Sequence, residues 1–138
     1  MNANETFFDT NILLYLISQD EAKAQRAETL LESGGLISVQ VLNELTAVLI
    51  RKIRMPWIEI REVLSLIRAL CSVEPITVAT HDQGLLLAER YGFPIYDAMI
   101  AASALLSGCH TLFTEDFQNG QRIENRLTIC NPFATLST

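Results

Sequence analysis

Four acidic residues, far apart in the sequence, stand where a carboxylate has chemical uses: Asp9, Glu44, Asp97 and Asp116. Glu44 is the most unusual, because its neighbours three and four positions away on a helix are mostly apolar. A carboxylate in such surroundings is costly unless it is paired, protonated or bound to a metal. Four acids brought together would repel one another, and a divalent cation would relieve that repulsion. Hard oxygen ligands suit Mg²⁺ or Mn²⁺.

The segments that must position these acids alternate between short strands and helices. Strands are expected at residues 5–9, 36–37, 75–78, 110–114 and 126–130, with helical patterns between them. Strands separated by helical crossovers imply a parallel sheet covered on both faces. The sequence therefore predicts a three-layer α/β fold, with a central, mainly parallel sheet of about five short strands. Ligands of such sheets bind beyond the carboxyl ends of the strands, where we expect the four acids to lie.

Local signals set the expected ends of the helices. Ser18 and Glu21 have the spacing of a capping box, and so do Thr80 and Gln83. Ser38 is expected to cap a helix whose apolar stripe runs from residue 41 to residue 53. Pro56 is expected in the first turn of a helix that runs to about residue 71. Gly92 is expected to end the helical pattern that precedes it.

Each acid also has a simpler interpretation. Asp97 precedes a helical pattern, where Asp is a favoured cap, and Asp9 could belong to a polar turn. Asp116 could be a surface loop residue, whereas Glu44 is the hardest of the four to explain without a function. The four acids together indicate a site more strongly than any one of them alone.

The composition favours one folded domain over residues 1–138. Hydrophobic residues make up 49% of the chain and charged residues only 19%, which excludes a disordered protein. The net charge is 10 − 16 = −6, which argues against a broad basic face for nucleic acid but leaves nucleic acid open as a substrate. Half of the ten basic residues fall within eighteen positions: Arg51, Lys52, Arg54, Arg61 and Arg68.

Several other features limit the compartment and the kind of metal site. The longest apolar run, residues 12–17, is too short to cross a membrane, and no basic residue precedes Lys23 as a secretory signal would require. We therefore expect a cytoplasmic protein without a membrane segment. The three cysteines are widely spaced and are expected to be buried thiols. Two histidines are too few for a histidine-rich zinc centre.

Four segments carry a resemblance to a known family. In order and spacing, FFDTNILLY, SVQVLNEL, YDAMIAASA and LFTEDFQNG resemble the PIN domain, and among its members the VapC-type toxins of bacterial toxin–antitoxin pairs. The resemblance extends from Thr6 to Pro132. It implies that the metal-binding and catalytic acids are Asp9, Glu44, Asp97 and Asp116, and that Asp116 rather than Glu115 fills the family's T-x-D pattern. Asn11 and Thr114 would support those carboxylates.

The resemblance also implies a reaction and a set of partners. The expected activity is Mg²⁺- or Mn²⁺-dependent hydrolysis of RNA phosphodiester bonds by a metal-activated water, which would inhibit translation. A cognate antitoxin would cover apolar grooves and place a basic side chain among the acids, and homodimers are typical of the family. Arg51, Lys52 and Arg54 are the candidates for RNA contact, because that segment has a local positive charge.

Two competing functions use the same residues. Phosphatases of the haloacid dehalogenase type also carry an Asp after the first strand, but they have a second Asp two positions later, where this sequence has Asn11. A regulatory module that holds a partner in an acidic groove without cleaving anything is the other alternative. Cleavage assays on purified protein separate these three functions.

Overall fold

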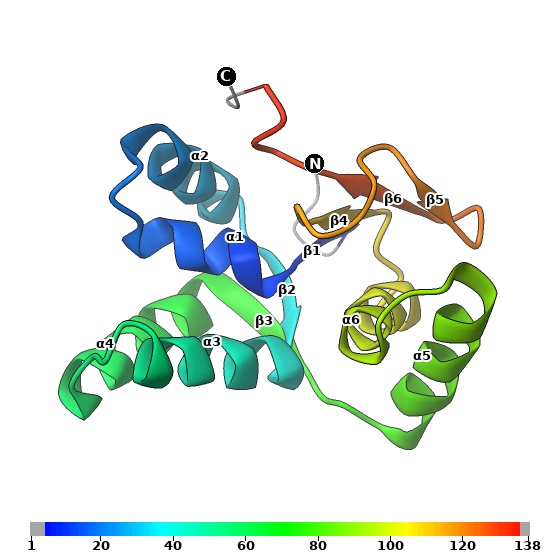
Figure 1. Cartoon of the computed structure of the whole chain (residues 1–138), viewed down its shortest axis with the longest axis horizontal. Helices are drawn as coiled ribbons and strands as arrows, with labels where there is room; N and C mark the ends of the chain where they lie inside the picture. Colours follow the sequence, from blue (N-terminus) through cyan, green and yellow to red (C-terminus); the bar gives the residue numbers. More distant parts are fainter. Residues whose placement is uncertain (1–4, 136–138) are drawn as a thin grey trace.

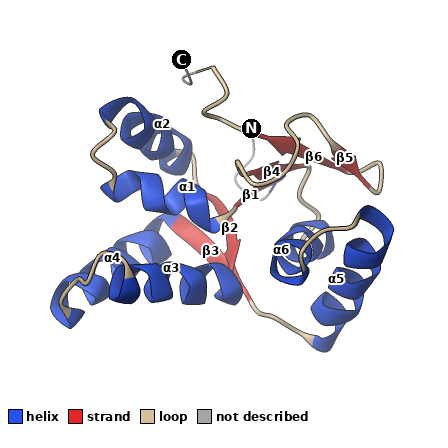
Figure 2. Ribbon diagram, in the orientation of Figure 1, coloured by secondary structure: helices blue, strands red, loops and turns tan. Residues whose placement is uncertain are grey.

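A computed structural model describes residues 5–135 as a central sheet flanked by helices (Figures 1 and 2). The strands are β1 (Thr6–Phe8), β2 (Gly35–Ser38), β3 (Cys71–Glu74), β4 (Thr111–Phe113), β5 (Arg122–Ile123) and β6 (Leu127–Cys130). The helices are α1 (Thr10–Leu14), the 3₁₀ turn η2 (Tyr15–Ile17), α2 (Glu21–Glu32), α3 (Val39–Arg51), α4 (Trp57–Leu70), α5 (Val78–Tyr91) and α6 (Ile95–Leu106). In the part of the chain described, no helix is long and apolar enough to span a bilayer.

The strands lie in the order β3-β2-β1-β4-β6-β5, and only the β5–β6 pair is antiparallel. The predicted mainly parallel α/β architecture is confirmed, with six strands rather than about five. The additional strand, β5, has two residues and joins β6 through a tight turn in which Glu124 and Asn125 have positive φ angles of 54° and 55°. The turn contains no glycine, so it lacked the signal that usually marks a hairpin.

One strand lies four residues earlier than the sequence indicated. A strand was expected at residues 75–78, but β3 occupies Cys71–Glu74, directly after α4. Pro75 follows the strand, and its missing N–H makes it a poor member of a ladder. Thr77 then caps α5 and forms a reciprocal capping box with Thr80. The sequence predicted Thr80 itself as the cap, which is wrong.

The other helix boundaries follow local hydrogen bonding. Asp20 caps α2 by accepting a bond from the backbone N–H of Lys23 at 3.2 Å, so the predicted cap at Ser18 is wrong. The predicted cap at Ser38 is confirmed, since its hydroxyl accepts a bond from the third residue of α3. Gly92 closes α5 with a φ of 74°, as the sequence predicted.

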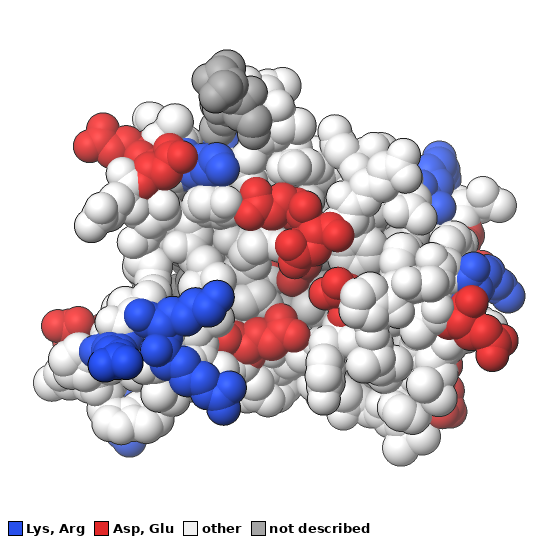
Figure 3. Space-filling model, viewed as in Figure 1, with Lys and Arg blue, Asp and Glu red and all other residues white. Residues whose placement is uncertain are grey.

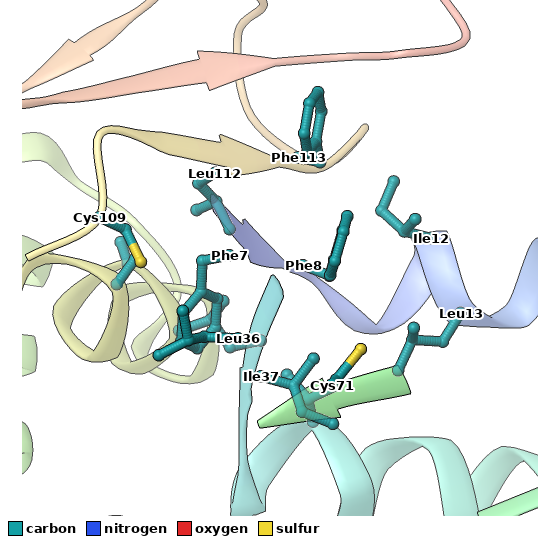
Figure 4. Close-up of a cluster of buried hydrophobic side chains, with 14 of the residues drawn as sticks. Phe7, Phe8, Ile12, Leu13, Leu36, Ile37, Cys71, Cys109, Leu112 and Phe113 are labelled. Atoms are coloured by element: carbon teal, nitrogen blue, oxygen red, sulfur yellow. The ribbon is translucent and has the colours of Figure 1, made fainter. Parts of the chain in front are cut away.

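The core lies where the central strands meet the helices, and two of its largest side chains come from β1 (Figure 4). Phe7 and Phe8 of β1 are fully buried, and Phe8 stacks on Phe113 of β4 with ring centroids 5.8 Å apart. Gly35 of β2 lies against the Phe8 ring, and a Cβ atom at Gly35 would overlap that ring. The position of the Phe8 ring therefore requires a glycine at residue 35.

Gly35→Ala tests this packing. The new methyl group would push the Phe8 ring against its neighbours, and overpacking of this kind costs about 1–3 kcal/mol of unfolding free energy. Urea unfolding should show that loss.

Gly84→Ala in α5 is the matched control, because its methyl group would meet the flexible Met99 side chain at 2.5 Å. That strain is offset by the helix propensity of alanine, about 1 kcal/mol above glycine. Equal destabilisation by the two variants would contradict the proposed role of the Phe8 ring.

Candidate functional site

The topology brings the four acids to one edge of the sheet. Asp9 directly follows β1 and Asp116 lies three residues after β4, and these two strands are parallel neighbours. Glu44 lies in the second turn of α3, which follows β2, and Asp97 lies in the first turn of α6. In Figure 3 the acidic side chains gather in the middle of this face, between α1, α3 and α6. Asp9 and Asp116 therefore lie at the carboxyl ends of adjacent strands, whereas Glu44 and Asp97 lie on helices that border the same edge.

Asp9 is the buried acid of the group, with only 2% of its surface exposed. It caps α1, and its Oδ1 accepts a hydrogen bond from the backbone N–H of Thr10 at 2.6 Å. Its Oδ2 accepts a bond from the Thr114 hydroxyl at 2.7 Å. Burial raises the pKa of Asp9 from 3.8 to about 7, and the charges of Asp116 and Asp97 act in the same direction, whereas the two hydrogen bonds lower it. The polar turn suggested for Asp9 is thus a buried helix cap.

Thr114 links the carboxylate of Asp9 to the loop that carries Asp116. Its hydroxyl donates to Asp9 and accepts a bond from the backbone N–H of Asp116 at 3.0 Å. The Asn11 amide donates to Asp116 Oδ2 at 3.0 Å and makes a longer, 3.5 Å contact with the Thr114 hydroxyl. Asn11 and Thr114 therefore contact the acids that they were expected to support.

Glu44 is stabilised by neutral hydrogen-bond donors. The Thr10 hydroxyl donates to its Oε1 at 2.6 Å, and the Gln40 amide donates to its Oε2 at 3.1 Å. Gln40 also donates to the backbone carbonyl of Tyr96 at 2.8 Å, which ties α3 to the start of α6. Sequence reasoning missed Thr10 and Gln40. The available signals were that Gln40 precedes Glu44 by one helical turn and that Thr10 is adjacent to Asp9.

Asp97 occupies a different position from the one predicted. No strand precedes it, and the residue that caps α6 is Pro94, so Asp97 is neither a cap nor at a strand end. Its side chain is half-buried in the first turn, and burial raises its pKa, with further increases from Asp116 and Glu44. Asp97 therefore lies within electrostatic range of Asp116 and Glu44, and its charge also raises the pKa of Asp9.

Glu115, next to Asp116, takes part in a separate contact. Its Oε1 accepts a hydrogen bond from the Tyr15 hydroxyl at 2.7 Å, and the Lys23 ammonium lies 3.4 Å from the same hydroxyl. The site therefore uses the two adjacent acids differently: Asp116 bonds to Asn11, and Glu115 bonds to a side chain of η2.

The residues present fit a hard divalent cation in their chemistry. Within residues 5–135, no Lys or Arg side chain forms an ion pair with any of the four acids, so their mutual repulsion is not offset. Asn11 Oδ1 is buried without a hydrogen-bond partner in the part of the chain described, which leaves a further oxygen donor. Carboxylate and amide oxygens are the ligands that Mg²⁺ and Mn²⁺ prefer.

The acidic side chains of the site do not form a complete metal-coordination shell in this structure. Among the described residues, no three acidic, histidine or cysteine side chains converge closely enough to ligate one ion. Neutral donors hold Asp9, Glu44 and Asp116 instead, whereas Asp97 has no hydrogen bond from a described side chain.

A basic patch lies beside the acids. Arg51, at the end of α3, and Lys52 and Arg54, in the segment that follows, are all exposed. Figure 3 shows basic side chains over α3 and α4, next to the acidic centre of the same face. The candidate RNA contacts are thus on the surface, at the end of α3 and in the segment before α4.

These features define an α/β protein with an acidic site at the carboxyl edge of a mainly parallel sheet. Comparison of the sequence with models of known families gives a match to the PIN domain over residues 6–120. The chain belongs to the PIN domain family. The predicted resemblance to this family is therefore confirmed. Comparison with curated protein sequences gave no match.

Solved structures show the same fold. A toxin–antitoxin complex from Klebsiella pneumoniae matches with a TM-score of 0.70 and 21% identity, covering 92% of this chain and 97% of that one. VapC20 of Mycobacterium tuberculosis, a toxin that cleaves the sarcin–ricin loop, matches with a TM-score of 0.68 and 22% identity, over 88% and 98%. VapBC2 of Rickettsia felis, bound to a promoter DNA fragment, has a TM-score of 0.66 and 21% identity, over 91% and 98%.

The raised pKa of Asp9 predicts how stability depends on pH in the presence of a chelator. The folded pKa of about 7 lies above the unfolded value of 3.8, so the contribution of Asp9 to stability is present below pH 3.8 and is lost as pH rises through 7. The Asp9→Asn variant lacks this loss. The unfolding free energy of the variant, relative to that of the wild type, should therefore increase by up to about 4 kcal/mol as the pH rises from 4 to 8.

Urea unfolding of both proteins across this pH range measures the difference. Glu115→Gln is the control, because it removes the charge of a nearby acid at a partly buried hydrogen bond, and its difference from wild type should change much less. A constant difference between Asp9→Asn and wild type at all pH values would show that burial does not raise the Asp9 pKa.

Proposed function

We propose that this protein is a metal-dependent endoribonuclease and the toxin of a toxin–antitoxin pair, which inhibits translation by cutting RNA in the cytoplasm. The observation that carries the proposal is the buried Asp9 carboxyl, whose pKa is raised and which faces Asp97 and Asp116. Perturbed acids gathered at a sheet edge are typical of functional sites. Membership in the PIN domain family supports a nuclease, and we propose that residues 1–138 form one such domain.

In this proposal Asp9, Asp97 and Asp116 hold Mg²⁺ or Mn²⁺, and Glu44 binds the ion directly or through water. A bound divalent ion supplies a water of lowered pKa and stabilises the negative charge that develops on the phosphate. The ion would also remove the cost of ionising Asp9, since an opposite charge favours the carboxylate.

The surrounding polar side chains would orient the acids. The Thr114 hydroxyl donates to Asp9 and fixes one of its oxygens, and Asn11 donates to Asp116. Thr10 and Gln40 hold both oxygens of Glu44, so its side chain has a defined direction before any ligand binds. Such neighbours of ligating groups tune both affinity and geometry.

The test is RNA cleavage by purified protein free of any partner. We expect cleavage with Mg²⁺ or Mn²⁺, loss with a chelator, and at least 100-fold loss in Asp9→Asn and Asp97→Asn, because each removes a charge from the site. Mn²⁺ should also raise the melting temperature of the wild type more than that of either variant, by preferential binding to the folded state.

Glu115→Gln is the matched control, since its carboxylate bonds to Tyr15 outside the acid cluster, and it should retain cleavage. Equal cleavage by wild type and the two Asp variants would identify a contaminating nuclease. Metal binding without cleavage would favour the alternative, a module that holds a partner in its acidic groove. Phosphomonoester hydrolysis with a phosphorylated Asp9 would instead indicate a haloacid dehalogenase-like phosphatase.

An apolar groove is the proposed docking site for the antitoxin. It has a volume of about 370 Å³ and lies between η2, α2 and α4. Its walls are mainly aliphatic, and Glu28 and Glu32 of α2 line the same groove. An amphipathic helix with apolar residues on one side and Lys or Arg at its edge would fit this surface. The solved toxin–antitoxin complexes of the same fold support such a partner, and we also propose that the toxin is a homodimer.

Leu66→Glu tests the groove. Leu66 lines it and is 56% exposed, so a charge there would oppose an apolar partner with little cost to the fold. We expect at least 10-fold weaker binding of the proposed antitoxin, measured by calorimetry, with RNA cleavage unchanged. The control is Leu106→Glu, an exposed leucine of α6 outside the groove, and equal weakening by both changes would contradict the assignment.

A further inference from the structure

Trp57 is the single tryptophan of the chain, and it lies on the surface. It begins α4, 62% of it is exposed, and with Ile58 and Arg61 it lines an open hollow of about 510 Å³. Burial of a tryptophan side chain is strongly favourable, so a large exposed fraction marks a surface that is available to a ligand.

Four basic residues lie within six positions of this tryptophan in the sequence. Arg51, Lys52, Arg54 and Arg61 are exposed, and within residues 5–135 none of their side chains has a hydrogen bond or an ion pair. Arg61 lines the same hollow as Trp57. The charge beside the tryptophan is therefore positive and uncompensated, and it would complement an anionic ligand.

The acidic residues of helix α4 lie away from the side that carries Trp57. Arg61 and Arg68 are four and eleven positions after Trp57, which places all three on one side of a helix. Glu59 and Glu62 project roughly a third of a turn or more away from them. The helix thus presents an aromatic ring and two cations on one side and its carboxylates on another.

The same patch is continuous with the acidic site through α3. Glu44 and Arg51 lie seven residues apart on this helix, which is about 10 Å along its axis. The segment after Arg51 leads directly to Trp57. Figure 3 shows the basic side chains of this region on the same face as the acids. A flexible polyanion bound at the acids could therefore reach the tryptophan.

We propose that Trp57 is a stacking platform for an unpaired base of single-stranded RNA, with Arg51, Lys52, Arg54 and Arg61 contacting the phosphates beside it. Aromatic rings flanked by cations bind single strands by stacking and charge, and duplex bases are not free to stack in this way. This inference rests on the proposed ribonuclease function and assigns Trp57 to the binding of its substrate. A protein partner of ordinary surface charge would leave the four cations unpaired.

The chain carries its own probe, because stacking of a base on the indole quenches tryptophan fluorescence and Trp57 is the only source. The experiment titrates the Asp97→Asn protein, which keeps the RNA intact, with a mixed-sequence RNA of twelve nucleotides at low salt. We expect saturable quenching by the single strand and little by the matching duplex. Anisotropy of the labelled RNA should show about 5- to 100-fold weaker binding by the additional change Trp57→Ala and near-normal binding by Trp57→Phe.

Val78→Ala is the matched control, an apolar residue 78% exposed at the start of α5, and it should bind RNA normally. Unchanged fluorescence on RNA binding, or equal affinity in Trp57→Ala, would overturn the platform even if the wild type cuts RNA. A change in oligomeric mass without a change in RNA affinity would assign the patch to a protein interface instead. If RNA quenches the tryptophan fluorescence but the wild type shows no metal-dependent cleavage, the stacking role of Trp57 would stand and the proposed nuclease activity would be refuted.

Discussion

The burial of one carboxyl group organises this site. Asp9 ends the central strand β1, starts α1 as its cap and lies beside Thr114 at the end of β4. Burial and two neighbouring acids disfavour the charged form of Asp9, so ionising this carboxyl costs free energy in the folded protein. Structures retain such a cost where it serves a function, and a bound cation would convert it into binding energy.

Other polar contacts keep that carboxyl and its neighbours in fixed positions. Thr10 connects the two halves of the site, because its backbone N–H bonds to Asp9 and its hydroxyl bonds to Glu44. Gln40 extends the network to the backbone at the start of α6. The acids thus sit on three helices and one loop that are tied together by neutral donors, and charge repulsion does not separate the elements that carry them.

The sequence was sufficient to predict the architecture and to bring Asp9 and Asp116 together, because the ends of parallel strands meet at one edge. Asp97 reaches the same edge from the first turn of α6, where no strand end was available to place it. Local errors arose where tertiary pairing overrides sequence signals: Cys71–Glu74 became a strand directly after a helix, and the turn at Glu124 and Asn125 formed without glycine. Of the two contacts that position Glu44, the one from Gln40 follows from helical spacing, whereas the one from Thr10 depends on tertiary structure, since an apolar helical pattern does not show which polar side chain from another segment will reach it.

The bond between Thr114 and Asp9 joins residues 105 positions apart in the sequence. During synthesis from the N-terminus, Asp9 emerges early, and the strand that must lie beside it arrives only after most of the chain has been made. Long-range pairing of this kind is slow and late in folding. The site is therefore incomplete until β4 and Thr114 have been made, because the buried Asp9 carboxyl lacks its hydroxyl partner before then.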